Sequence, residues 1–287
     1  MTEERVARRR AAWAVYDDMA ATGAYDALLN EAGQVVLAPD GENEAAFFCS
    51  VLSGRDRVLD LGCGPGFPGI FLTHCVRAVY GVDASPAMLG QAQRNVATLC
   101  IPNICLVRAF AENLPFAGFN FDGIAVCGTL GSVSNPGVVL REMARVAAPG
   151  ALLASIEQDY RRRLAEGAPR EECRLRRDRG YLELQVVQYL TEPYRIRSEH
   201  YVLDSASQFA QQFRDLPALL NEGFTATGIR PAHLPPEAIV DTFCEEEAQF
   251  DPETLRDACE QTGFDVVEQR TSISYGVPHI LSVFRRR

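Results

Sequence analysis

Residues 57–70 read Arg-Val-Leu-Asp-Leu-Gly-Cys-Gly-Pro-Gly-Phe-Pro-Gly-Ile, and this stretch decides the fold. Its apolar start has the composition of a buried strand, which passes directly into Gly62, Gly64 and Gly66. Glycine at every second residue lets the backbone turn sharply and leaves room for a ligand. Pro68 suits the first turn of a following helix, because its missing N–H is not needed there. A glycine turn between a parallel strand and a helix is where a doubly wound α/β fold holds a nucleotide.

A second signal is the acidic residue that ends the next apolar strand. Ala78 to Val82 predict this strand, and Asp83 follows it, 21 residues after Gly62. At that separation a carboxylate can accept hydrogen bonds from both hydroxyls of a ribose. Asp83 could instead cap the next helix, but Ser85 and Pro86 already supply a cap and a first helical residue. We therefore predict that Asp83 binds a ligand.

The glycine spacing argues against two common nucleotide classes. The dinucleotide fingerprint needs a sixth-position glycine, and Phe67 stands there, so nicotinamide dinucleotides fit poorly. A Walker phosphate loop needs a lysine, and the chain contains none.

Five ordered segments of the chain resemble class I S-adenosylmethionine-dependent methyltransferases. They are residues 58–66, 79–89, 111–116 followed by Phe121-Asp122, 140–146, and Pro149-Gly150. The resemblance covers residues 57–157 and extends, less closely, to 252–287. It implies a doubly wound, Rossmann-like α/β fold whose mostly parallel seven-stranded sheet has an antiparallel last strand. It also implies S-adenosylmethionine as cofactor and S-adenosylhomocysteine as product.

The same resemblance, carried over residue by residue, implies which positions contact the cofactor. They are Asp60, Gly62, Cys63, Gly64, Gly66, Asp83, Ala84, Met88, Ala111, Glu112, Cys127 and Gly128. In the family, N-terminal helices often cover the cofactor and supply a tyrosine, which makes Tyr16 and Tyr25 candidates. The alternative for these tyrosines is packing, as parts of an aromatic stripe on an amphipathic helix.

One loop departs from the family pattern. Where relatives usually carry an acidic residue that accepts from the adenine amino group, this chain has Phe110. Phe110 could stack on the adenine, backbone groups of Ala111 and Glu112 could bind it, or Phe110 could simply pack in the core. Cys127 precedes glycine at an apolar strand end, and we assign it a structural role.

Apolar periodicity predicts a βα alternation with a large insertion. The predicted helices are 42–52, 68–76, 86–99, 136–147 and 252–262, and the predicted strands are 58–61, 78–82, 104–108, 121–127, 151–157, 264–273 and 277–285. Residues 1–160 and 251–287 would form the cofactor-binding domain with an N-terminal helical cover, and 161–250 an inserted lid that binds the acceptor. Within the insertion we expect a hairpin of 184–190 and 195–203, and mainly helical structure over 205–250 with an exposed acidic run, Glu245 to Glu247.

An arginine-rich segment, residues 161–179, carries eight arginines against four acids. We interpret it as a solvated helix face with ion pairs. A docking surface for an anionic partner is the alternative.

The composition of the chain argues against several other classes of protein. The 287 residues carry a net charge of −10, which argues against a nucleic-acid partner. Nine cysteines without paired spacing do not favour a disulfide framework or a metal site. We find neither a membrane span nor a secretory leader, and expect a cytoplasmic protein. The oligomeric state stays open, with a homodimer among the assemblies that the sequence allows.

Methyl transfer needs a general base only for some acceptors, so few residues are fixed by mechanism. The best candidate for the general base is His200, because the predicted hairpin that carries it should lie over the cleft. His233 and His279 are weaker candidates for the base, and His74 is interpreted as structural. Glu157, Gln158 and Asp159 could bind the acceptor.

Three functions follow. The first is methylation of a small-molecule metabolite at oxygen, nitrogen or carbon. The second is methylation of RNA or protein through the segment 161–179. The third is a non-methylating enzyme, a cyclase or decarboxylase, that retains S-adenosylmethionine.

Overall fold

The computed structural model describes most of the chain in two compact units. The described residues are 8–9, 28–29, 32–37, 39–133, 135–165, 171–178, 181–191, 194–214, 225–226 and 229–287. The core unit comprises residues 13–166 and 248–287, and the inserted unit comprises residues 1–12 and 167–247. Each unit has a sheet of its own.

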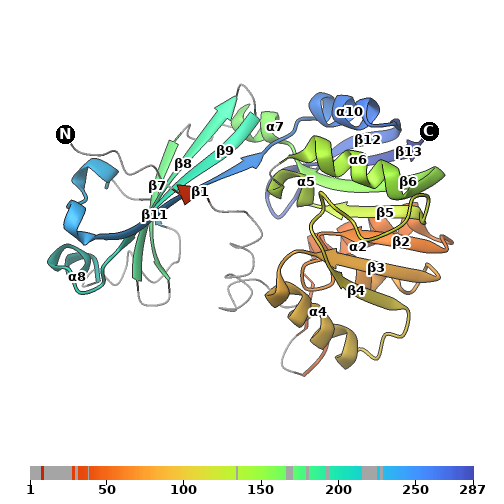
Figure 1. Ribbon diagram of the computed structural model, residues 1–287, viewed down its shortest axis with the longest axis horizontal. Helices are drawn as coiled ribbons and strands as arrows, with labels where there is room; N and C mark the ends of the chain where they lie inside the picture. Colours follow the sequence, from red (N-terminus) through yellow and green to blue (C-terminus); the bar gives the residue numbers. More distant parts are fainter. Residues whose placement is uncertain are drawn as a thin grey trace. The chain divides into compact units, whose positions relative to one another are not determined.

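The core unit is built on a seven-stranded sheet with the order β12-β13-β6-β5-β2-β3-β4 (Figure 1). The strands are β2 Arg57–Leu61, β3 Ala78–Asp83, β4 Ile104–Arg108, β5 Phe121–Cys127, β6 Ala147–Gln158, β12 Phe264–Ser274 and β13 Val277–Arg286. Strands β2 to β6 pair in parallel, whereas β13 is antiparallel to both β6 and β12. The predicted doubly wound sheet with an antiparallel last strand is therefore confirmed.

Helices cover both faces of this sheet. They are α2 Pro39–Leu52, α3 Gly69–Leu72, α4 Pro86–Thr98, α5 Thr129–Ser132, α6 Pro136–Val146, α7 Tyr160–Ala165 and α10 Pro252–Gln261. Apolar residues of α6 and α10 pack with Ile124 and Val126 of β5, and those of α2 pack with Ala125 from the other face. Alternate residues of a strand point to opposite faces, so one strand carries both halves of the core.

Helix starts follow the predicted caps, and one helix is shorter than predicted. The Ser85 hydroxyl accepts from the Met88 N–H at 3.0 Å, and the Asn135 side chain accepts from the Val138 N–H at 3.2 Å. Ser134, which by residue type could also cap this helix, lies outside the described residues. The predicted helix 68–76 is α-helical only over Gly69–Leu72, because the chain then tightens into turns with three-residue hydrogen bonds such as Cys75 N–H to Leu72 O.

The inserted unit is a six-stranded sheet with the order β1-β11-β9-β8-β7-β10. Its strands are β1 Arg8–Arg9, β7 Glu171–Asp178, β8 Tyr181–Thr191, β9 Tyr194–Leu203, β10 Thr225–Ala226 and β11 Ile239–Ala248, with helix α8 Gln208–Arg214 and two short 3-10 turns, Pro231–His233 and Pro236–Ala238. Antiparallel β8 and β9 confirm the predicted hairpin.

Two secondary-structure predictions for the insertion were wrong. Residues 171–178 form a strand and not a helix face, since Cys173 and Leu175 alternate with polar residues and pack in the apolar cluster of this unit. Residues 239–248 form β11 and not a helix, in keeping with the β-branched and aromatic run Ile239, Val240, Thr242 and Phe243.

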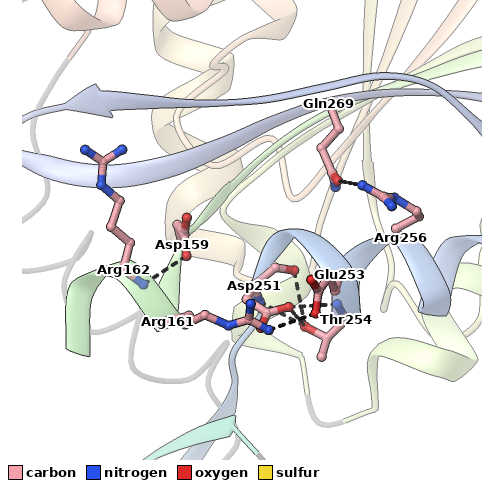
Figure 2. Close-up of polar contacts among 8 residues, drawn as sticks. All are labelled: Asp159, Arg161, Arg162, Asp251, Glu253, Thr254, Arg256 and Gln269. Atoms are coloured by element: carbon pink, nitrogen blue, oxygen red, sulfur yellow. Dashed lines mark hydrogen bonds and ion pairs between the residues drawn. The ribbon is translucent and has the colours of Figure 1, made fainter. Parts of the chain in front are cut away.

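The chain leaves and re-enters the core unit at one point, which polar contacts hold together (Figure 2). The Tyr160 N–H donates to the Phe250 carbonyl at 2.8 Å, and the Tyr160 side chain is fully buried. Arg161 forms ion pairs with Asp251 and, at 3.0 Å, with Glu253. Because these contacts join the start of α7 to the start of α10, they fix the base of the insertion.

Two further findings concern the described residues. Within them, no helix combines the length and apolar character that a membrane crossing requires. All nine cysteines have free thiols.

Candidate functional site

The glycine turn is fastened to the end of the neighbouring strand. The N–H groups of Gly62 and Cys63 donate to the Val82 carbonyl at 2.8 and 3.0 Å. Gly62 has a φ of +71°, and a Cβ built on it would lie 2.1 Å from Oγ1 of Thr129. Gly64 also has a positive φ, +49°, but a Cβ there would meet no atom within 4 Å. The turn is therefore tightly packed at Gly62 and open at Gly64.

Asp83 accepts backbone hydrogen bonds through both carboxylate oxygens. Oδ2 accepts from the Gly64 N–H and Oδ1 from the Ser85 N–H, each at 2.9 Å. Ser85 caps α4 as predicted, so the helix does not need Asp83 as its cap. Each carboxylate oxygen can accept more than one hydrogen bond, so these two backbone donors alone do not saturate the carboxylate.

Asp60 lies beneath the turn and is fully buried. Its Oδ2 accepts from the Gly69 N–H at 2.8 Å, and its Oδ1 has no hydrogen-bond partner among the described residues. Burial raises the pKa of Asp60 well above its ordinary value, and the Gly69 N–H opposes this rise. The side chains of Cys63 and Met88 are also buried in the core, which leaves their backbone groups as the parts available to a ligand.

The loop after β4 carries Phe110, whose exposed fraction is 51%. Core packing, one of the alternatives for this residue, is therefore wrong. Ala111 and Glu112 follow Phe110 directly, and the N–H of Ala109 donates to the Asp83 carbonyl at 3.1 Å. The loop is thus anchored beside the end of β3, where the Ala84 carbonyl accepts from Arg108 at 3.3 Å.

The loop after β5 is held by the end of β6. Cys127 is followed by Gly128, which has a φ of +64° and no atom within 4 Å of a built Cβ. The buried Glu157 carboxylate accepts from the N–H groups of Leu130 at 3.1 Å and Gly131 at 3.4 Å. Burial raises the pKa of Glu157 to about 8, against these two backbone donors. Burial also raises the pKa of the Cys127 thiol well above its usual value, in keeping with a structural role.

The predicted cofactor residues thus gather at the carboxyl ends of neighbouring strands. The turn from Gly62 to Gly66 follows β2, and Asp83 ends β3. Ala111 lies in the loop after β4, and Gly128 follows the end of β5. Tyr16 and Tyr25 lie outside the described residues.

The other predicted acceptor ligands serve local structure. Gln158 accepts from Arg163 at 2.9 Å, and Asp159 accepts from the Arg162 N–H at 3.1 Å (Figure 2). His74 and His233 are exposed, and His279 contacts the Val277 carbonyl at 2.9 Å.

His200 belongs to the inserted unit, on β9, and is 2% exposed. Its Nδ1 contacts Oε1 of Glu183, and its Nε2 lies 3.6 Å from Oε2 of Glu245. Burial lowers the pKa of His200, but the two carboxylates outweigh burial and the pKa is raised above its ordinary value. The imidazole is thus held between two acids, and its protonated form is favoured.

Sequence reasoning missed the residues around His200. We expected Glu245 to be exposed within an acidic run, but it is 9% exposed and faces the imidazole. Phe243, two residues earlier, stacks on the His200 ring with centroids 4.3 Å apart. The signal that could have found both residues is the two-residue period of a strand, which the helical prediction for this region hid.

Comparison with known proteins agrees with this geometry. Residues 58–150 match the methyltransferase domain family. An uncharacterized methyltransferase of Synechocystis sp. is 32% identical over 108 residues, which cover 37% of this chain and 49% of that protein. The demethylmenaquinone methyltransferase of Geobacillus kaustophilus is 34% identical over 104 residues, 35% of this chain and 44% of that protein. The chain therefore spans about half the length of the curated relatives it matches.

Among solved structures, the CcbJ methyltransferase from Streptomyces caelestis resembles the whole chain. Its TM-score is 0.61 at 18% identity, and the alignment covers 94% of this chain and 97% of that one. At this identity the likeness shows a shared fold.

Proposed function

We propose that the protein is an S-adenosylmethionine-dependent methyltransferase that acts on a small molecule, because residues 58–150 match the methyltransferase domain family. The observation that carries the proposal is the pairing of Gly64 with Asp83. An open glycine stands beside a carboxylate that its two backbone donors alone do not saturate, at the carboxyl ends of two adjacent parallel strands. Open α/β sheets bind nucleotides at this edge.

The residues present fit S-adenosylmethionine. Asp83 would accept from the ribose hydroxyls, and the bare backbone at Gly64 and Gly128 leaves room for the methionine portion. The unpartnered Oδ1 of Asp60 is a buried acceptor below the same turn. Phe110, half exposed on the loop after β4, offers an aromatic face to an adenine. When bound, the cofactor supplies a methyl group carried on a sulfonium.

The chain itself positions the reacting groups. Glu157 holds the loop after β5 by accepting two backbone N–H groups, so this loop keeps one conformation beside the glycine turn. Orientation of this kind is the main contribution a protein makes to an in-line displacement. A small hydroxyl, amino or carbon acceptor is consistent with the acidic charge of the chain.

The general base that we predicted at His200 stays a prediction. Since its pKa is raised, less of the imidazole is in the basic form at a given pH than in an ordinary histidine. A reaction that uses His200 as base would therefore accelerate as the pH rises through that pKa.

The nucleic-acid or protein alternative depends on the arginines of residues 161–179, and three of those that the structure describes are engaged within the protein. Arg161 is paired with Asp251, Arg163 with Gln158, and Arg174 with Glu172 at 2.7 Å. Arginines engaged in this way have less to offer to an anionic partner.

The test is a screen for transfer of an isotopically labelled methyl group to small amines, phenols, carboxylic acids and carbon nucleophiles, with S-adenosylhomocysteine measured in parallel. Calorimetry should show that wild-type protein binds both forms of the cofactor. The proposal is wrong if neither form binds while another nucleotide does. Conversion of a substrate without formation of S-adenosylhomocysteine would instead support the non-methylating alternative.

A further inference from the structure

The two faces of the sheet in the inserted unit differ, because one carries an apolar cluster and the other includes several buried polar side chains. Leu182 and Leu184 of β8 join the apolar cluster with Ala210 of α8. Glu183, between the two leucines, points to the opposite face and contacts His200 of β9 there. A buried polar face is unusual for a sheet, because desolvated polar groups destabilise a fold unless they are paired.

The polar face contains three atoms that lack a hydrogen-bond partner among the described residues. They are Oε1 of Gln185, Nε2 of His200 and Oε1 of Glu245. Gln185 and His200 are direct cross-strand neighbours, and His200 is 3.6 Å from Glu245, too far for a hydrogen bond. These atoms therefore form one cluster, which we call the His200 cluster.

Two of these three atoms are acceptor oxygens, and their surroundings are acidic. Glu183 and Glu245 lie on either side of His200, and the neighbouring Glu172 and Arg174 neutralise each other. Even with a protonated imidazole the cluster has more negative than positive charge. A ligand that satisfies it must bring hydrogen-bond donors, and a positive charge would add attraction.

The cluster also has an aromatic wall. The rings of Phe243 and His200 are stacked, with an interplanar angle of 10°. This stacking fixes the orientation of the imidazole, and with it the position of Nε2 next to Glu245.

We propose that the His200 cluster binds a small molecule through a protonated amino group. Its N–H groups donate to Oε1 of Glu245 and Oε1 of Gln185, the two acceptor oxygens that lack a partner among the described residues. Glu245 and Gln185 then determine which amines this cluster accepts.

Matched probes test the chemistry of the site on the full-length protein. Benzylamine, protonated at neutral pH, and benzyl alcohol have nearly the same shape and differ in the group offered to the carboxylate. We expect benzylamine to bind about tenfold or more tightly than benzyl alcohol, by titration in ligand-observed NMR, since hydrogen bonds between charged groups are the stronger ones. Equal affinities, preference for the alcohol, or binding of neither probe would overturn the proposal.

Two variants locate the site. Glu245→Gln should remove the preference for benzylamine. Glu199→Gln should keep it, because Glu199 adjoins His200 on β9 but points to the opposite face, where it accepts from the Tyr201 hydroxyl at 2.9 Å. If both variants or neither variant lost the preference, the assignment to Glu245 would be wrong.

A third variant needs no ligand. Gln185→Met removes the buried, unpartnered Oε1 of Gln185 and keeps a side chain of similar size, so it should raise the thermal midpoint of the free protein by roughly 2 to 4 °C while weakening benzylamine binding. A lowered midpoint would mean that Gln185 is structurally satisfied, and the proposal would fail. Calorimetry with S-adenosylhomocysteine on the same samples separates the two proposals, because loss of cofactor binding contradicts methyl transfer and leaves the amine preference intact.

Discussion

The Gly64 N–H donates to Oδ2 of Asp83 at 2.9 Å across 19 residues of sequence. This bond joins the glycine turn after β2 to the end of β3, and it orients the carboxylate toward the one glycine of the turn whose Cβ direction is open. Binding geometry at this edge is thus preset by the backbone, which lowers the entropy lost when a ligand binds.

The first prediction concerns Gly64. In Gly64→Ala the added methyl group meets no protein atom within 4 Å, so the variant should fold, with about 1 kcal/mol of strain from its positive φ. The methyl group would fill the space that we assign to the cofactor. We expect S-adenosylhomocysteine affinity, measured by calorimetry, to fall at least about tenfold.

Gly54 provides the matched control. It has a φ of +76° and also no atom within 4 Å of a built Cβ, but it precedes β2 at the opposite end of the strand. Gly54→Ala should therefore show similar strain and unchanged affinity. Equal affinity losses in both variants would refute the assignment of Gly64 to the cofactor site.

The second prediction concerns the charge of Asp83. Asp83→Asn keeps the size of the side chain but weakens the hydrogen bonds to ligand hydroxyls, so cofactor binding should weaken by about 1 to 3 kcal/mol. Asp122→Asn is the control, because the Asp122 carboxylate also accepts two backbone N–H groups, from Asp56 and Arg57 at 2.9 Å. Calorimetry that finds the same loss for both, or none for Asp83→Asn, would contradict the ribose assignment.

The fold of the core unit, and the position of the glycine turn next to Asp83, could be predicted from short stretches of the sequence. The strand, the glycines and Asp83 lie close together in the chain, and each has a pattern that strand and turn chemistry require. The environment of His200 had no such pattern, because Glu183 and Glu245 come from different strands of a sheet. The burial of Glu245 and Glu157 is decided by tertiary packing, and the spacing of residues does not reveal it.

The third prediction separates the two roles of Asp251 at the base of the insertion. Asp251 caps α10 by accepting from the Thr254 N–H at 2.8 Å, and it pairs with Arg161 (Figure 2). Asp251→Asn keeps the cap and loses the ion pair, whereas Asp251→Ala loses both. We expect the alanine variant to be less stable than the asparagine variant by about 1 kcal/mol in thermal unfolding. Equal stabilities would mean that the cap contributes nothing.

The last prediction concerns Glu157 and pH. Its pKa is about 8 in the folded protein, whereas the ordinary pKa of a glutamate is 4.5. Between these values the folded state keeps a proton that the unfolded state has lost, so the contribution of Glu157 to stability is full below about pH 4.5 and declines as the pH rises to about 8. The total decline is on the order of 4 kcal/mol.

Glu157→Gln removes this dependence, because the amide resembles the protonated carboxyl group and its oxygen still accepts from the Leu130 N–H. We expect thermal unfolding measured from pH 5 to pH 8.5 to show that the midpoint of Glu157→Gln increases relative to that of the wild type as the pH rises. Glu142→Gln should show no such gain, since its bond with Arg145 lowers the pKa of Glu142 and keeps it ionised over this range. A constant difference between Glu157→Gln and wild type across the range would mean that Glu157 is ionised in the folded protein.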